Sequence, residues 1–142
     1  MSDELINGIY VSIKQEPTSK IVQGIKNHEF RNYIPKKSFK FMYVYVTAPQ
    51  SQLKYVIEIG NIVKYPEQLE ITGDGNLDFN QGKKSKYAYP IIKVYELTNP
   101  ISLEELKNKF GFVPPQAFSY AETYTELTEQ ILKAEKVVVI NR

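Results

Sequence analysis

The chain has 142 residues, with 18 Lys and Arg against 16 Asp and Glu, so its formal charge is only +2. It has no Cys and no Trp, which excludes disulfides, zinc–thiolate sites and a cysteine nucleophile. Its single histidine, His28, excludes a multi-histidine metal site, and we expect no metal and no cofactor. No apolar run approaches the ~20 residues that span a bilayer. The length and these absences predict one cytoplasmic domain over residues 1–142, without membrane contact.

Basic residues gather in one part of this nearly neutral chain. Between positions 14 and 40 there are seven Lys and Arg against two Glu, which gives a local charge of +5. Residues 122–136 instead carry four Glu against two Lys. A basic segment on a neutral chain is typical of a surface that binds an anionic partner, although a solvated lysine-rich face gives the same pattern.

The first half of the sequence predicts three strands and one short helix. Residues 9–13 are β-branched and predict a strand. The helix is expected at 16–24, because Pro17 suits a first helical turn and Gly24 suits the position just after the end. Residues 41–47 and 54–64 are apolar on two faces, which predicts strands inside a sheet or barrel, with a bulge or bend at Gly60.

The middle of the chain reads as irregular structure followed by a third long strand. A helical turn is expected at residues 66–69, a tight turn at 73–76 and a polar, basic loop at 80–86. Residues 87–97 predict a strand, in which Pro90 favours an edge position or a bend.

Two capping boxes predict the helices of the C-terminal part. Ser102 with Glu105 begins a helix that ends at Gly111, and Ser119 with Glu122 precedes a longer one. In the longer helix the apolar residues recur at helical spacing, at positions 124, 127, 131 and 134. Residues 137–140, Val-Val-Val-Ile, predict a buried closing strand. Because no regular βαβ alternation exists, these elements predict an α+β fold, a small barrel with helices packed outside it.

One segment resembles a family signature. Residues 24–31, GIKNHEFR, resemble the G-x-K-x-x-E-x-R motif of ASCH domains, which lie within the PUA-like superfamily of small β-barrels. Further blocks agree in order, at residues 45–49, 73–79 with 86–89, and 99–103 through 115–120. The resemblance covers about residues 9–120, and residues 121–142 form a C-terminal helix and strand extension.

The resemblance implies a PUA-like β-barrel whose open cleft is lined by the motif. Members are mostly predicted RNA-binding proteins, so it implies RNA or a nucleotide-like ligand as the partner, with a regulatory role in RNA metabolism or transcription. In such a cleft Arg31 offers a planar fork of donors, and Glu58 accepts from an exocyclic amine. The expected ligand-binding residues are Lys14, Lys26, Glu29, Arg31, Tyr33, Thr47, Glu58 and Tyr120.

Two other functions stay open. One branch of the family resembles amidohydrolases of N4-acetylcytidine, and some relatives are linked to RNA cleavage. In that branch Lys26 would act as base and Glu58 would assist, but Glu29 stands where the branch has its threonine nucleophile. Ser12 or Thr47 would then have to supply the hydroxyl. The third function is a protein-interaction module that binds a partner through an exposed edge strand.

Overall fold

The computed structural model describes residues 7–142. The strands of this part are β1 (Gly8–Ile13), β2 (His28–Arg31), β3 (Phe41–Val46), β4 (Gln52–Ile59), β5 (Val63–Lys64), β6 (Tyr87–Ser102), β7 (Ser119–Tyr120) and β8 (Lys136–Asn141). The helices are α2 (Gln15–Val22), α3 (Asn76–Asn80), α4 (Leu103–Phe110) and α5 (Thr125–Lys133), with a 3-10 turn, η1 (Ala121–Tyr124), before α5.

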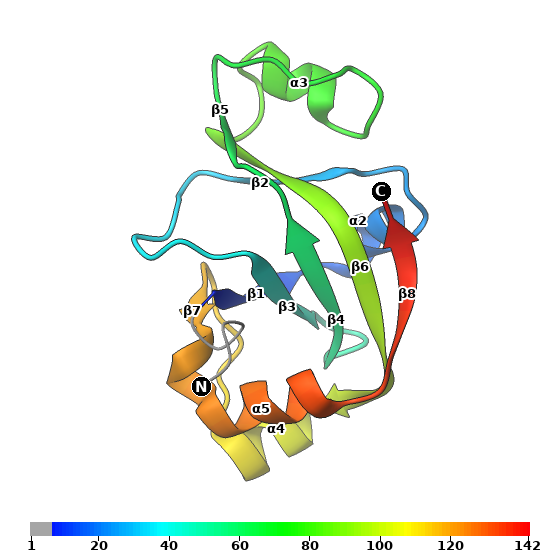
Figure 1. The fold of residues 1–142 in the computed structure, drawn as a ribbon, viewed down its shortest axis with the longest axis vertical. Helices are drawn as coiled ribbons and strands as arrows, with labels where there is room; N and C mark the ends of the chain where they lie inside the picture. The colour runs from blue at the N-terminus through cyan, green and yellow to red at the C-terminus, as the bar shows by residue number, and fades with distance from the viewer. Residues whose placement is uncertain (1–6) are drawn as a thin grey trace.

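The strands form one curled sheet in the order β2-β6-β4-β3-β1-β7. Strands β1 and β3 are parallel, and the other pairs are antiparallel. The 16-residue strand β6 curves through the whole molecule and also pairs with β5 and β8 (Figure 1). Strands with short helices packed outside them confirm the expected α+β fold.

Side chains that alternate along the strands build two apolar clusters. In β1, Ile9, Val11 and Ile13 point to one side and Tyr10 points to the other, because successive side chains of a strand face opposite ways. The inner cluster comprises Ile9, Val11, Ile13, Ile21, Met42, Val44, Val46, Tyr55, Ile57, Ile59, Tyr89, Ile91 and Val94. The outer cluster comprises Tyr10, Tyr43, Tyr45, Leu53, Val56, Leu97, Ile101, Leu106, Phe112, Ala121, Leu127 and Ile131.

Helices α4 and α5 cover the outer cluster at one end of the molecule (Figure 1). Leu106, Leu127 and Ile131 are completely buried there, and burying each such side chain contributes about 1.5–3 kcal/mol. The Tyr10 hydroxyl lies 2.6 Å from Thr128 Oγ1, which donates in turn to the Ala121 carbonyl at 2.9 Å. The helical spacing expected for α5 is therefore confirmed, with a buried polar pair in addition.

The two predicted capping boxes have different outcomes. Ser102 caps α4, since its hydroxyl accepts the Glu105 backbone N–H at 3.1 Å, and Gly111 ends that helix with φ 63°. The prediction that Ser119 caps a helix is wrong. Ser119 lies in β7 opposite Tyr10, η1 follows it, and α5 begins only at Thr125. Pairing with β1 takes up the backbone that a helix N-terminus would need.

The strand expected at 54–64 is in fact two strands. β4 ends at Ile59, and Gly60, where a bulge or bend was expected, donates its backbone N–H to the Pro90 carbonyl at 2.9 Å. The pairing of β4 with β6 shifts register between Glu58 and Ile59. An edge position for Pro90 is wrong because β6 has partners on both sides. Pro90 instead marks the bend where β6 passes from β2 to β4.

Residues 65–86 form a separate lobe above the sheet (Figure 1). The helical turn expected at 66–69 is absent from this described segment, and the helix is α3, which lies between the turn predicted at 73–76 and the loop predicted at 80–86. Asn76 anchors α3, because its Nδ2 donates to Asn27 Oδ1 at 3.0 Å and to the Glu70 carbonyl at 2.9 Å. Asn76 makes these side-chain hydrogen bonds to residues 49 and 6 positions away, and local sequence patterns do not predict such bonds.

The closing strand β8 is more exposed than predicted. It pairs with β6, and Val137 and Val138 are 57% and 45% exposed. The prediction of a buried strand is wrong because β8 lies at an edge of the sheet. No helix among the described residues is long and apolar enough to cross a membrane.

Candidate functional site: a buried charge cluster

Strand β2 carries Glu29 and Arg31 on one face and His28 and Phe30 on the other. In the antiparallel pairing with β6, Glu29 lies opposite Tyr89, which belongs to the inner cluster. Directly opposed residues share a face of the sheet. The Glu29 and Arg31 side chains therefore point toward the inner side of the barrel.

Glu29 pairs with two cations at once. Its Oε2 accepts a hydrogen bond from Arg31 Nε at 2.9 Å and forms an ion pair with Nη2 at 2.8 Å, and its Oε1 lies 3.6 Å from Lys26 Nζ. The side chains of Lys26, Glu29 and Arg31 are 8%, 9% and 12% exposed. We call these three residues the charge cluster. It confirms none of the expected ligand contacts, but it brings three of the predicted site residues together.

Arg31 joins three segments of the chain at the charge cluster through hydrogen bonds. Beyond Glu29, it donates to the Tyr33 hydroxyl at 3.0 Å, to the Ser12 carbonyl at 3.2 Å and to the Ala117 carbonyl at 3.5 Å. Burial opposes the charge of the guanidinium, but Glu29 and these bonds outweigh it and raise the pKa of Arg31. All three nitrogens of the guanidinium thus donate to acceptors within the protein, so Arg31 mainly positions the site.

Lys26 has fewer partners in the protein than Arg31. Its ammonium contacts Glu29 and lies 4.6 Å from the centre of the Phe30 ring, and residues 7–142 give it no other ion pair. Burial lowers the pKa of Lys26; Glu29 opposes the shift, and the nearby Lys84 adds to it. Lys84 also approaches the Phe30 ring, at 5.7 Å. The ammonium of Lys26 thus keeps donor capacity for an incoming acceptor.

The cluster carries an excess of positive charge. Two cations face one carboxylate within it. At its edge, Lys84 from the loop at 80–86 adds a third cation and Asp74 a second carboxylate, so three cations face two acids. A buried charge without a full complement of partners favours an anionic ligand. The arrangement is suited to binding an anion.

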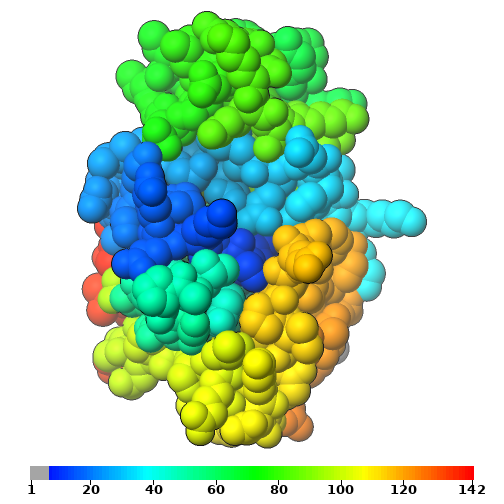
Figure 2. All heavy atoms as spheres, turned by 180° about the vertical axis from the view of Figure 1, so that it is seen from behind, coloured from blue at the N-terminus to red at the C-terminus, as the bar shows by residue number. Residues whose placement is uncertain are grey.

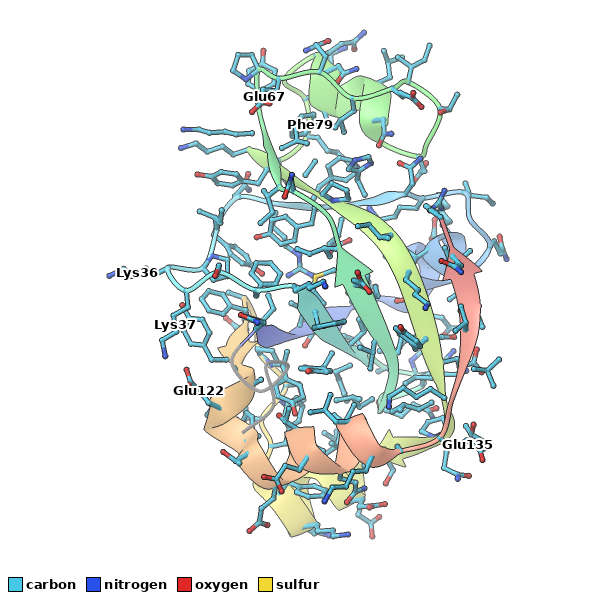
Figure 3. The ribbon with its side chains drawn as sticks, in the orientation of Figure 1. Lys36, Lys37, Glu67, Phe79, Glu122 and Glu135 are labelled. Carbon is cyan, nitrogen blue, oxygen red and sulfur yellow. The ribbon has the colours of Figure 1, made fainter. Side chains whose placement is uncertain are left out.

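A row of aromatic rings extends from the cluster. Tyr33 donates its hydroxyl to the Ala117 carbonyl at 2.7 Å and stacks on Phe118, with ring centroids 5.4 Å apart. Phe118 packs edge-on against Tyr120 at 5.2 Å. Lys37 lies 5.0 Å from the Tyr120 ring centre and pairs with Glu122, and Figure 3 shows these two side chains facing each other. The predicted residues Tyr33 and Tyr120 therefore belong to one aromatic row.

The structure does not bring Glu58 to the charge cluster. Its neighbours Ile57 and Ile59 point into the inner cluster, so Glu58 faces the opposite side of β4. There it lies 3.8 Å from Lys40 Nζ. Placing Glu58 beside Lys26 was wrong, because strand alternation separates them, and the Lys26–Glu58 pair of the hydrolase alternative is not assembled.

Lys14 and Thr47 follow the ends of the adjacent parallel strands β1 and β3. The Thr47 N–H donates to the Ile13 carbonyl at 3.1 Å, and the Lys14 carbonyl accepts the Thr18 hydroxyl at 2.7 Å. Within residues 7–142, neither side chain makes an ion pair or hydrogen bond with the charge cluster. In Figure 2, the dark blue of β1 lies recessed between the teal segment after β3 and the orange segment before β7.

The described residues do not assemble a hydroxyl nucleophile beside Lys26 or a metal site. In the described part of the chain, no hydroxyl is hydrogen-bonded to Lys26; the Ser12 hydroxyl donates to the Pro115 carbonyl at 2.7 Å instead. The same residues hold no group of three His, Asp or Glu side chains that could bind a metal.

His28 lies on the other face of β2. Its Nδ1 is 2.7 Å from Asn27 Oδ1, and its ring stacks on Phe30 with centroids 6.4 Å apart. Burial, together with Lys26 and Arg142, lowers the pKa of His28 to about 4. The imidazole is therefore neutral at pH 7.

Sequence reasoning missed several residues that complete the site. Ser12 and Ala117 take part through backbone carbonyls, which carry no side-chain signal. Phe118 comes from a segment far away in the chain, whereas Lys84 belongs to the loop at 80–86 that was predicted to be basic. The alternation of Ile57, Glu58 and Ile59, in contrast, was a usable signal that Glu58 points outward.

Comparison with known proteins supports the fold. No family model matches the sequence, and no curated protein matches it. Among solved structures, the ASCH protein of Zymomonas mobilis matches at 21% identity and a TM-score of 0.67, over 91% of this chain and 96% of that one. A tyrosine-to-phenylalanine variant of that protein matches at 22% identity and a TM-score of 0.64, over 91% and 99% of the two chains. A serine-to-alanine variant matches at 24% identity and a TM-score of 0.61, over 87% and 96%. The resemblance to ASCH domains thus holds at the level of the fold, and this chain adopts the α+β, PUA-like barrel fold of the ASCH proteins.

Proposed function

We propose that this protein binds single-stranded RNA, or a nucleotide-like part of it, at the charge cluster. The single observation that carries the proposal is Lys26, a nearly buried ammonium paired at 3.6 Å with a carboxylate that Arg31 also engages at 2.8 Å. Because Arg31 already satisfies Oε2, Lys26 remains the donor with capacity for a phosphate or a base acceptor.

The surroundings of the cluster fit an extended polyanion. The basic loop at 80–86 places Lys84 beside Phe30, and Lys37 lies at the far end of the aromatic row. Cations along a groove neutralise backbone phosphates, and aromatic rings stack unpaired bases. The helices α4 and α5, which carry most of the acidic side chains of the C-terminal part, lie at the other end of the molecule (Figure 1).

The proposal is tested by the affinity for a fluorescent single-stranded RNA octamer at two salt concentrations. The variant is Lys26→Met, which removes the ammonium and leaves the Arg31–Glu29 pair intact. A hydrogen bond to a charged group is worth roughly 1.5–3 kcal/mol, so we expect binding to weaken by about tenfold or more. Each lost phosphate contact should also reduce the slope of log K against log salt by about 0.7.

A matched control is Lys107→Gln. Lys107 is an exposed lysine of α4, so this variant removes the same charge from the far end of the molecule. It should bind RNA like the wild type. Equal, salt-independent binding by the wild type and Lys26→Met would contradict the proposal.

A further inference from the structure

A second hollow lies beyond the charge cluster, between the β2–β3 loop and the turn that joins β4 to β5. Its volume is about 480 Å³, within the range of roughly 300–1,000 Å³ for small-molecule pockets. We call it the loop pocket. The lining residues that matter here are Ile34, Lys36, Ser38, Phe39, Asn61 and Ile62.

The floor of the loop pocket is apolar and anchored. Phe39 and Ile62 pack against the inner cluster, and Phe39 meets the Tyr89 ring edge-on with centroids 5.4 Å apart. Ile34 closes one side and is 49% exposed. A flat apolar surface next to an exposed isoleucine suits the face of a planar ring.

The rim of the pocket offers polar groups without partners in the protein. Within residues 7–142, the Ser38 hydroxyl and the Asn61 amide make no hydrogen bond, and Lys36 makes no ion pair. Figure 3 shows Lys36 pointing away from the body of the molecule. An amide supplies both a donor and an acceptor, which is the pattern that base edges require.

Tyr89 connects the loop pocket with the charge cluster. It pairs with Glu29 across the strands, packs against Phe39, and donates its hydroxyl to the Tyr33 carbonyl at 2.5 Å. Tyr89 thus contacts the floor of the loop pocket and lies opposite Glu29 in the strand pairing.

The strand register places cations along the same path. Tyr87 of β6 lies opposite Arg31 on one side and opposite Lys64 on the other. Strands lie ~4.8 Å apart, so these two cationic residues start roughly 10 Å from each other on the same face. Lys64 is exposed and so adds a cation for the RNA backbone on the face that carries Arg31.

We propose that the loop pocket binds one unpaired nucleobase of the RNA whose phosphates lie at the charge cluster; this rests on the proposed function. The base stacks over Phe39 and Ile62, its edge pairs with the Asn61 amide and the Ser38 hydroxyl, and Lys36 lies next to its phosphate.

The test compares a single-stranded RNA hexamer with an abasic ribose-phosphate hexamer of the same charge. We expect the wild type to bind the RNA at least tenfold more tightly than the abasic oligomer. The variants are Ile34→Ser and Asn61→Ala, both at exposed positions. They should bring the two affinities to within about twofold. Val113→Ser, which changes an apolar side chain that is 66% exposed outside the pocket, should retain the preference.

The outcomes separate this inference from the function on which it rests. Equal binding of both oligomers, still weakened by Lys26→Met, would overturn the base pocket alone. A preference for RNA that persists in Ile34→Ser and Asn61→Ala would also overturn it, because the base would then bind elsewhere. Failure of both oligomers to bind would overturn both proposals.

Discussion

The Arg31 guanidinium engages a single carboxylate oxygen of Glu29 through two nitrogens: Nε donates a hydrogen bond to Oε2 at 2.9 Å, and Nη2 forms an ion pair with it at 2.8 Å. The remaining donors of Arg31 reach the Ser12 and Ala117 carbonyls and the Tyr33 hydroxyl. One side chain therefore links β1, β2 and the segment before β7. A lysine cannot reproduce a planar fork of this kind.

Arg31→Lys should destabilise the protein although it conserves the charge. It leaves the part-buried Ser12 carbonyl without this donor and loses the planar pairing with Glu29, and an unmade bond to a buried polar group costs about 1–3 kcal/mol. Urea unfolding should show a loss of about 2–3 kcal/mol. Arg142→Lys is the control, because Arg142 is exposed and reaches only the Gly24 carbonyl, at 3.4 Å. Equal midpoints for both variants would show that the Arg31 fork adds nothing to the fold.

Glu29→Gln should be more harmful than Lys26→Met. The first change leaves two nearly buried cations without their carboxylate, and breaking a buried pair in this way costs about 3–5 kcal/mol. The second leaves Glu29 fully paired with Arg31. Thermal melts of the two variants at equal salt would check this order, and the reverse order would contradict the assignment of Glu29 as the centre of the cluster.

His28 makes the stability depend on pH. Its pKa is about 4 in the folded protein, below the ordinary value of 6.5, so the unfolded chain binds a proton between these values that the native state does not. Stability should therefore fall as the pH falls from 6.5 toward 4. Because part of the ring is exposed, we expect a loss of only about 1 kcal/mol between pH 7 and pH 5.

The control for this pH effect is His28→Gln, in which that part of the loss should disappear. His28 is the only histidine, so its imidazole signals in proton NMR are unambiguous. A titration midpoint near 6.5 for these signals would contradict the buried, neutral ring.

The two Ser-x-x-Glu motifs should respond differently to alanine. Ser102→Ala removes the cap of α4, whose bond to the Glu105 N–H measures 3.1 Å, and should cost about 1 kcal/mol. Ser119→Ala should cost less than half of that, since Ser119 lies in β7 and caps no helix. Chemical unfolding of both variants is the measurement, and equal losses would contradict this difference.

Local patterns in the sequence predicted those strands, helix ends and caps that are determined by residues close together in the chain. Three kinds of signal depend on neighbours a few residues away: the β-branched or apolar runs of β1 and β3, the glycines Gly24 and Gly111 after their helices, and the Ser102 cap. The second capping box failed because Ser119 pairs with Tyr10, which is 109 positions earlier. The same holds for Pro90, whose place inside β6 is decided by partners on both sides of that strand.

The candidate site was predicted only in part, because only some of its residues are close together in the sequence. Lys26, Glu29 and Arg31 lie within six residues, so their convergence follows from one short strand and the turn before it. Glu58 was misplaced because its position depends on which face of β4 meets the inner cluster. The Ser12 and Ala117 carbonyls belong to segments that only the folded chain brings to Arg31.

The most direct test of the central claim is an amide-correlation NMR titration of the protein with the single-stranded RNA octamer. Binding at the charge cluster predicts shifts concentrated at residues 26–33 and 84–87, with little change in the amides of α4 and α5. Shifts confined to α4 and α5, or to β8, with residues 26–33 unchanged, would contradict it.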